Sequence, residues 1–232
     1  MSKLLNVSSS PHVRCGVSTK NLMYDVAIAM LPATIWGVMQ FGIYSLIVVV
    51  ATVLSCVLSE SLFETLMHKP VTISDGSALV TGMILGLNMP PAIPLWMPIL
   101  GGVFAIIVVK QLYGGLGQNW MNPALAARCF MLISFAQAMT KFTDPVTDAV
   151  ASATPLAAIK AGDTYDLAAM FIGKIPGTIG EVSVIALLIG AAYLLVKKVI
   201  TIRIPAAYIL SFAVFAFIFG QHNINYVLAE VC

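Results

Sequence analysis

The sequence predicts an all-α, polytopic membrane protein with about seven hydrophobic segments, two of them broken helices. Of its 232 residues, 59% are hydrophobic and only 9% are charged, whereas about a quarter of the residues in a soluble domain are charged. The charges also cluster, so that residues 26–59, 76–109 and 204–229 contain no Asp, Glu, Lys or Arg. Because a helix needs roughly 20 mainly apolar residues to cross a bilayer, each of the first two stretches has room for more than one span or for a broken one.

The same composition excludes several classes of protein. So few charges could not keep the surface of a soluble enzyme solvated, and the chain lacks the polar composition of a disordered protein. The formal net charge of +2 provides no basic field for phosphate backbones, so we expect the lipid bilayer and no nucleic acid as a partner. The four cysteines stand far apart without a CxxC spacing, which indicates neither a disulfide scaffold nor a zinc site.

Apolar stretches and the polar residues between them define the expected elements in order. Residues 1–22 are polar and lack an apolar stretch before any processing site, which predicts a cytoplasmic N-terminal segment rather than a signal peptide. Residues 23–232 are predicted to form a single membrane domain. Its expected hydrophobic segments are about 23–41, 43–63, 76–89, 94–113, 123–139, 178–196 and 204–219.

The third and fifth segments are the predicted broken helices. The third ends in residues 88–91 (NMPP), and the fifth opens with residues 119–123 (NWMNP) after a glycine-rich run. Proline removes a backbone donor and glycine loosens the chain. Non-helical backbone at membrane depth persists only where it is buried in protein or lines a cavity, and half-helices of this kind frame binding sites near the midplane. Simple interfacial turns are the alternative interpretation.

The orientation follows from Lys and Arg, which gather on the cytoplasmic side of membrane proteins. Three basic residues within 1–22 precede the first segment and place the N-terminus in the cytoplasm. Alternation then puts Lys110 and the basic cluster at 197–203 inside, and it puts the long connection 140–177 outside.

Chemically active side chains are scarce. The three histidines lie in expected loops or at segment ends without a second ligand nearby, so no metal site is predicted. Asp25 marks either an ion path or an interfacial carboxylate that the helix dipole favours. Glu60 and Glu64, one helical turn apart, indicate either an ion site or, as we favour, a solvated helix end. Arg128 needs an anionic or carbonyl partner if it is buried, unless it reaches the membrane surface.

The connection 140–177 contains an informative stretch at residues 148–156 (DAVASATPL). Small neighbours let a bulky group approach the hydroxyl of Thr154, and Pro155 disfavours an α conformation for this threonine. A threonine presented in this way can accept a covalent modification. Loops of Ser, Ala, Thr and Pro are common, so this pattern alone does not identify the group.

A resemblance to a known family rests on several motifs. They are residues 10–12 (SPH), 74–82 (SDGSALVTG), 88–91 (NMPP), 113–130 (YGGLGQNWMNPALAARCF) and 148–156. Together they resemble the RnfD/NqrB family, whose members are membrane subunits of the Rnf ion-translocating electron-transport complex and of the sodium-pumping NADH:quinone oxidoreductase. The resemblance runs from the first residues to at least Pro155.

The resemblance implies a flavin site. In the family, a threonine in a D-x-x-[ST]-[GS]-A-T-like motif carries FMN through a phosphoester that a dedicated flavin transferase makes. Here the acceptor would be Thr154, with Ser152 and Ala153 before it and Asp148 opening the motif. Ala151 departs from the usual Ser or Thr, which bears on recognition by the transferase but leaves the acceptor hydroxyl in place. The family carries this flavin on the outer side, where the charge distribution also places Thr154.

The resemblance also implies a role and partners. The chain would be one part, inactive alone, of a ferredoxin:NAD oxidoreductase in the bacterial cytoplasmic (inner) membrane, assembled with the other Rnf subunits (A, B, C, E and G). It would relay electrons through the covalent FMN while Na⁺ or H⁺ is moved, and a second, non-covalent flavin is a further expectation. Family members are longer and have an inverted-repeat, transporter-like fold, so we expect this sequence to be a C-terminally truncated piece of such a subunit.

The alternative is a passive channel or secondary transporter of the aquaporin or urea-channel type, without a cofactor. Residues 122–124 match the Asn-Pro-Ala triplet of aquaporins, but a water channel needs two such half-helices that meet at mid-membrane. The sequence contains no second Asn-Pro-Ala, and residues 88–90 lack its form. A structural membrane scaffold without a cofactor is a third interpretation.

Overall fold

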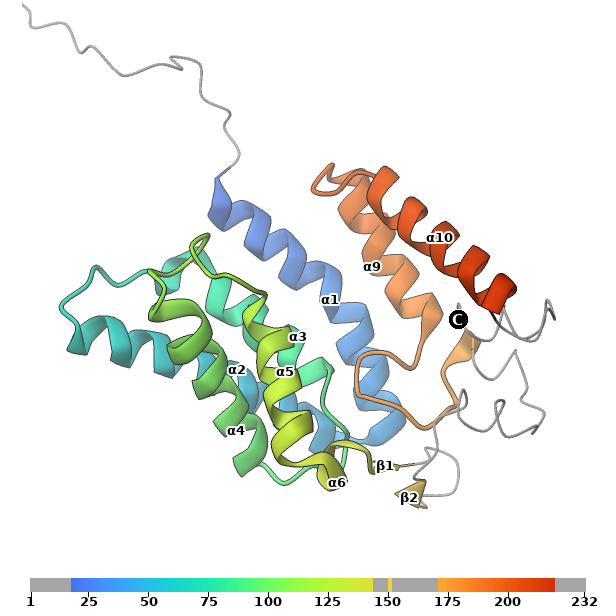
Figure 1. Ribbon diagram of the computed structural model, residues 1–232, viewed down its shortest axis with the longest axis horizontal. Helices are drawn as coiled ribbons and strands as arrows, with labels where there is room; N and C mark the ends of the chain where they lie inside the picture. The colour runs from blue at the N-terminus through green and yellow to red at the C-terminus, as the bar shows by residue number, and fades with distance from the viewer. Residues whose placement is uncertain (1–17, 144–149, 152–170, 220–232) are drawn as a thin grey trace, which may run out of the picture.

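The computed structural model describes residues 18–143, 150–151 and 171–219, and most of them lie in helices (Figure 1). The elements are α1 (Thr19–Phe41), α2 (Ile43–Leu66), the short 3₁₀ turn η1 (Ile73–Asp75), α3 (Ser77–Leu87), α4 (Trp96–Val103), the π-helix η2 (Phe104–Gln111), α5 (Pro123–Ser134), α6 (Ala136–Met139), β1 (Phe142–Thr143), β2 (Val150–Ala151), α9 (Val184–Val196) and α10 (Arg203–Phe219). The two short strands pair antiparallel, with Phe142 opposite Ala151. The predicted helical class is confirmed for the described body of the protein, and this small pairing is an addition to it.

The two longest described helices are α1 and α2, with 23 and 24 residues. At 1.5 Å per residue each is about 35 Å long, which matches a bilayer core about 30 Å thick. Both are long and apolar enough to cross a membrane, whereas α3, the α4–η2 unit, α5, α9 and α10 are shorter apolar helices. Each predicted hydrophobic segment therefore contains a helix, while the number of complete spans and the inverted repeat stay predictions.

The break after α3 is held by a loop from far along the chain. α3 ends at Leu87, and two backbone carbonyls at and just beyond this end accept hydrogen bonds from residues after position 170. The Gly180 N–H donates to Leu87 O at 2.8 Å, and the Ile179 N–H donates to Met89 O at 3.1 Å. Because backbone groups away from water must be paired, these bonds make the break part of the protein interior.

The Asn-Pro-Ala triplet forms the start of α5. Asn122 Oδ1 accepts hydrogen bonds from the backbone N–H of Ala124 at 3.0 Å and of Leu125 at 3.4 Å. Pro123 occupies the first helical position, where its missing N–H costs nothing. The predicted break at this point is therefore a capped helix N-terminus.

Two glycines allow α2 and α3 to approach closely. A Cβ on Gly82 would lie 2.6 Å from Val53 Cα, and a Cβ on Gly86 would lie 3.0 Å from Val49 Cα. Lipid supplies no hydrophobic drive that pushes helices together, so their association depends on close van der Waals packing at small residues. This contact fixes the depth of α3 along α2.

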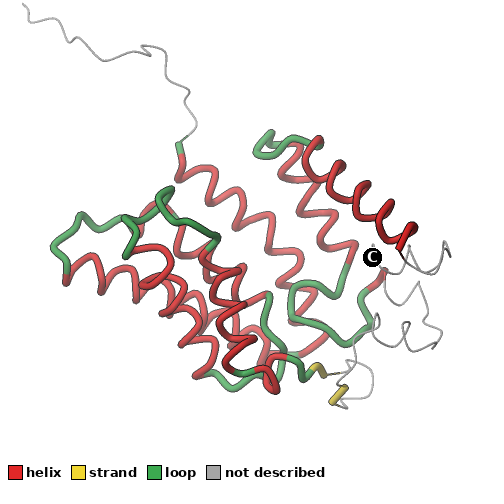
Figure 2. Tube along the Cα trace, in the orientation of Figure 1, coloured by secondary structure: helices red, strands yellow, loops and turns green. Residues whose placement is uncertain are grey.

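Helix α1 contacts α2 and α3 as well as α9 (Figures 1 and 2). Gly190 of α9 lies directly against the carbonyl of Ala29, and Gly37 lies against Ile179. The exterior is apolar, and α10 exposes Ile204, Tyr208 and many other large hydrophobic side chains. Apolar exteriors of this extent are expected where helices face lipid.

We predict that Gly82→Ala lowers stability by about 1–3 kcal/mol, because the new methyl group would overlap the backbone of α2. The matched control is Gly101→Ala in α4, where the added Cβ would lie 3.4 Å from the flexible Met131 Cγ. Thermal unfolding in detergent measures both, and an equal loss in the two variants would contradict the close contact.

Candidate functional site

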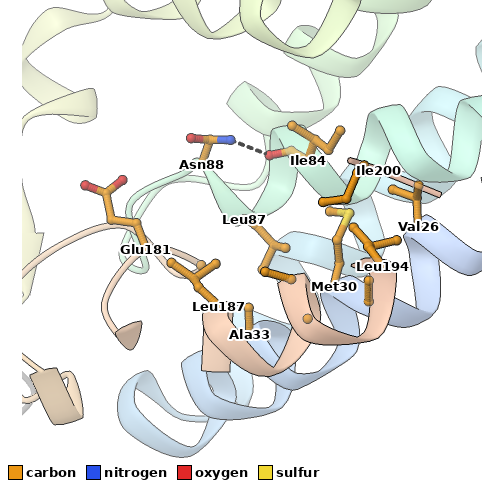
Figure 3. Close-up of a pocket in the computed structure, with 14 residues that line it drawn as sticks. Val26, Met30, Ala33, Ile84, Leu87, Asn88, Glu181, Leu187, Leu194 and Ile200 are labelled. Atoms are coloured by element: carbon orange, nitrogen blue, oxygen red, sulfur yellow. Dashed lines mark hydrogen bonds between the residues drawn. The ribbon is translucent and has the colours of Figure 1, made fainter. Parts of the chain in front are cut away.

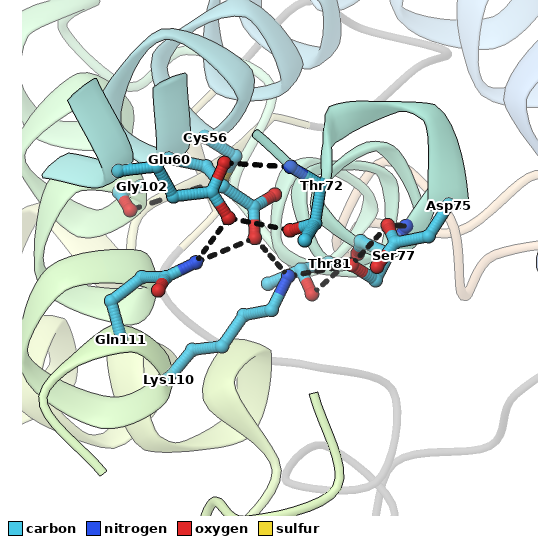
Figure 4. A network of polar contacts seen from close by, with 10 residues as sticks. Cys56, Glu60, Thr72, Asp75, Ser77, Thr81, Gly102, Lys110 and Gln111 are labelled. Atoms are coloured by element: carbon cyan, nitrogen blue, oxygen red, sulfur yellow. Dashed lines mark hydrogen bonds and ion pairs between the residues drawn. The ribbon is translucent and has the colours of Figure 1, made fainter. Parts of the chain in front are cut away.

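A buried network of charged and polar side chains joins one end of three helices (Figure 4). Glu60 and Glu64 come from the last third of α2, Ser77 begins α3, and Lys110 and Gln111 end η2. All five residues are less than 5% exposed. Charged side chains are therefore buried inside a protein that has few charged residues in total.

An ion pair forms the centre of the network. Lys110 Nζ lies 2.5 Å from Glu60 Oε1, and the two side chains are 2% and 0% exposed. The same ammonium donates to Ser77 Oγ at 2.6 Å. Buried ions lose their hydration, so each has to be compensated by close partners of this kind.

Gln111 links the two carboxylates of α2. Its Nε2 donates to Glu60 Oε1 at 2.8 Å and to Glu64 Oε1 at 3.3 Å. Glu64 also accepts from the backbone N–H and the hydroxyl of Thr72, at 2.9 and 2.5 Å. Because Thr72 is exposed, the network runs from the surface of the protein to the fully buried Glu60.

Asp75 adds a third carboxylate next to the ion pair. Its Oδ1 accepts from the Ser77 N–H at 2.8 Å and from the Ser77 hydroxyl at 2.6 Å. The described network thus contains one ammonium and three carboxylates. Glu60 Oε2 is buried and has no hydrogen-bond partner among the described residues. Such an arrangement attracts positive charge, because its field is weakly screened away from water.

The π-helical winding of η2 brings Lys110 and Gln111 to the same carboxylate oxygen. Successive residues of an α-helix point about 100° apart. A π-helix has i→i+5 bonds and a wider turn, so that successive side chains point in more similar directions. π-helical turns are rare and are frequently found at functional sites.

The structure corrects our interpretation of Glu60 and Glu64 as a solvated helix end. The two carboxylates are 0% and 2% exposed, because η2 and the 72–77 segment cover this face of α2. Lys110, which we placed on the cytoplasmic side near the end of the expected segment 94–113, is buried beside them. One feature of the sequence indicated this burial: Lys110 directly follows the charge-free stretch 76–109, so it has no charged neighbour on its N-terminal side.

The other two sequence candidates have partners. Arg128 Nη1 donates to Asn88 Oδ1 at 2.5 Å, and Nη2 lies 3.8 Å from Glu181 Oε2, while its side chain is 35% exposed and therefore only partly buried. Asp25 accepts from the Tyr193 hydroxyl at 2.8 Å and lies 3.9 Å from Lys197 Nζ. Asp25 is therefore held by the end of α9.

The flavin-site residues carried over from the family lie outside the described part of the chain. They are Asp148, Ser152, Ala153 and Thr154. The neighbouring β1–β2 pairing brings the backbone of residues 142–143 next to that of residues 150–151. The covalent FMN site thus stays a prediction. Within the described residues, no group of three or more His, Cys, Asp or Glu could hold a metal ion.

Among the cavities of the described residues, two border side chains discussed above. A groove of about 420 Å³ lies between α1, α3 and α9, with apolar walls and with Asn88 and Glu181 at one end (Figure 3). A smaller cavity of about 170 Å³ adjoins the buried network, and Lys110, Asn119 and Asn122 contribute to its lining. Amide and ammonium groups in such a cavity are the kind that orient a polar ligand.

Buried carboxylates and a buried lysine inside apolar helices are typical of membrane proteins that move ions or protons. Comparison with known proteins gives the family. Residues 6–231 match the model of the NQR2, RnfD, RnfE family, and the chain belongs to this family.

Named relatives agree with this assignment. The chain is 46% identical over 231 residues to the D component of the Na⁺-translocating ferredoxin:NAD⁺ oxidoreductase complex of Acetobacterium woodii, over 97% of this chain and 73% of the relative. It is 39% identical to the D component of the proton-translocating complex of Clostridium ljungdahlii, over 94% of this chain and 70% of the relative. The D component of the ion-translocating oxidoreductase complex of Halorhodospira halophila is 32% identical, over 91% of this chain and 70% of the relative.

We predict that Lys110→Met destabilises the protein by about 3–5 kcal/mol, because it leaves a buried carboxylate without its counter-ion. The double variant Glu60→Gln/Lys110→Met should lose less than the sum of the two single changes. Unfolding midpoints in detergent give these values. Lys197→Met is the control, since its pair with Asp25 is partly exposed and contributes about 1 kcal/mol or less. Strictly additive losses would show that Glu60 and Lys110 do not interact.

Proposed function

We propose that the chain is the RnfD subunit of an Rnf-type, ion-translocating ferredoxin:NAD oxidoreductase and works only as part of that complex. The observation that carries the proposal is the buried network around Glu60 and Lys110, which gives the membrane body a place for charge. The names of the relatives support it, because they describe the same component of Na⁺-translocating and proton-translocating complexes. The other Rnf subunits (A, B, C, E and G) are the proposed partners.

The redox part of the proposal is FMN bound to Thr154 through a phosphoester. When it is bound, the flavin supplies one- and two-electron exchange, and the protein supplies position and electrostatics. Thr154 would provide the hydroxyl, Pro155 would keep the backbone out of an α conformation, and Ser152 and Ala153 would leave room for the phosphate. Attachment would require a flavin transferase. A second, non-covalent flavin is also part of the proposal.

The proposed location is the bacterial inner membrane, with several spans and a cytoplasmic N-terminus. The contacts between helix ends support the alternation behind this topology. Asp25 near the start of α1 meets Tyr193 near the end of α9, as antiparallel neighbours require. On the opposite side, Tyr44 at the start of α2 donates to Ile93 O at 2.9 Å, beyond the end of α3.

The aquaporin-like alternative is less well supported by the geometry. Asn122 starts α5 in the manner of a channel half-helix. Asn88, in contrast, stands at the end of α3, where its Nδ2 donates to Ile84 O at 2.8 Å. A water channel needs two helix N-termini that face each other, and the 88–90 segment supplies a C-terminus instead.

Coexpression with a flavin transferase should yield a protein that fluoresces in a denaturing gel and gains the mass of one FMN less one water, because a phosphoester survives denaturation. Thr154→Ala should lose both signals and remain in the membrane. Thr147→Ala, in the same connection, is the matched control and should keep them. An unmodified wild-type mass beside a modified known acceptor would refute covalent attachment.

A cysteine placed at Ala157, in a background without the native cysteines, should react with a membrane-impermeant thiol reagent added to intact cells. A cysteine at Ser18 should react only after the membrane is opened, since this residue precedes α1 on the proposed cytoplasmic side. Labelling with the reverse pattern would overturn the orientation.

A further inference from the structure

One carboxylate oxygen of Glu60 accepts hydrogen bonds, and the other has no hydrogen-bond partner among the described residues. Its Oε1 accepts from Lys110 and Gln111, while Oε2 is buried and makes no hydrogen bond within the described part of the protein. A buried polar atom without a partner is costly, and here it leaves the carboxylate with capacity to bind another cation. Glu60 is fully buried, and the small cavity lined by Lys110 and Ser77 adjoins the network.

The charges and atoms around Glu60 specify the kind of ligand. The carboxylates of Glu60 and Glu64 and the amide oxygen of Gln111 are oxygen donors, which hard cations prefer. Lys110 is the cation that now occupies the Glu60 carboxylate. A monovalent cation that took its place would leave the charge on Glu60 balanced as it is now, whereas an anion would meet an excess of carboxylates.

Lys110 also has an alternative partner close to Glu60. Its ammonium already contacts Ser77 Oγ at 2.6 Å, and that hydroxyl donates to Asp75 Oδ1 at 2.6 Å. The carboxylate of Asp75 is thus one hydroxyl away from the ammonium (Figure 4). Lysine is a compact charge on a flexible four-carbon stem, so it can move between neighbouring carboxylates without a change in the helices.

We propose that Lys110 is an intramolecular competitor for the cation at Glu60. The ammonium and a small monovalent cation occupy the Glu60 carboxylate in turn, and Ser77 with Asp75 receives the ammonium while the cation is bound. Lys110 is thus a positioning residue that sets the affinity of the site. This inference rests on the proposed function, because it describes how the same protein handles its ion.

Competition has a quantitative consequence. The apparent affinity for the cation equals the intrinsic affinity multiplied by the fraction of molecules in which Lys110 has left Glu60. Lys110→Gln removes the competitor and keeps a polar side chain. Asp75→Asn removes the alternative partner, so Lys110 stays on Glu60 and the cation binds more weakly. A purely structural lysine would produce neither change in affinity.

The test measures the unfolding midpoint of the purified full chain as NaCl replaces choline chloride at constant ionic strength and pH. We expect the half-saturating Na⁺ concentration of Lys110→Gln to fall about tenfold or more, since the competing fraction disappears. Asp75→Asn should raise it, Glu60→Gln should abolish the response to Na⁺, and Lys197→Gln should match the wild type. If Lys110→Gln does not fold, Lys110→Arg replaces it and should raise the half-saturating concentration, because guanidinium binds carboxylate in a bidentate manner.

Three results would overturn the inference. They are an unchanged half-saturating concentration in Lys110→Gln, or in Lys110→Arg where that variant replaces it, a full Na⁺ response in Glu60→Gln, and no Na⁺ response in any variant. None of these variants alters the connection that contains Thr154, so FMN attachment remains a separate readout. A flavinylated protein without the competition would disprove the role of Lys110 alone, whereas an unmodified Thr154 would count against the proposed redox function.

Discussion

The contact between Glu60 and Lys110 is the constraint on which the charged end of the bundle depends. The two residues belong to α2 and η2, and their side-chain atoms lie 2.5 Å apart with almost no exposure. Neither ion could stay there alone, because the loss of hydration would exceed any other local gain. The pair therefore fixes the position of η2 against α2, and the hydroxyl of Ser77 ties the start of α3 to both.

Close packing of small residues makes this burial possible. Gly82 and Gly86 let α3 approach the backbone of α2, which brings Ser77 to the depth of the ion pair. A larger side chain at Gly82 would separate the helices and leave a gap beside the carboxylates. In this protein the polar network consequently depends on the close apolar contact between α2 and α3.

Much of the fold could be predicted from local features of the sequence. Charge-free stretches indicated the helices, Pro90 and Pro91 indicated the end of α3, and Asn122 with Pro123 indicated the start of α5. The partners of Glu60 could not be predicted, because Lys110 is 50 positions away and the register between α2 and η2 depends on tertiary packing. The π-helical winding also has no local signature in this segment. The flavin residues around Thr154 lie outside the described residues, and their role stays a prediction from the resemblance.

Helix α3 is anchored at both ends by quite different contacts. Ser77 at its start touches the Lys110 ammonium, while Leu87 at its end accepts the N–H of Gly180 from the loop that follows the 140–177 connection. An α-helix of 11 residues is a stiff rod about 16 Å long. The loop that follows the 140–177 connection and the charged end of the bundle are thus bound to opposite ends of the same helix, whose position along α2 is set by Gly82 and Gly86.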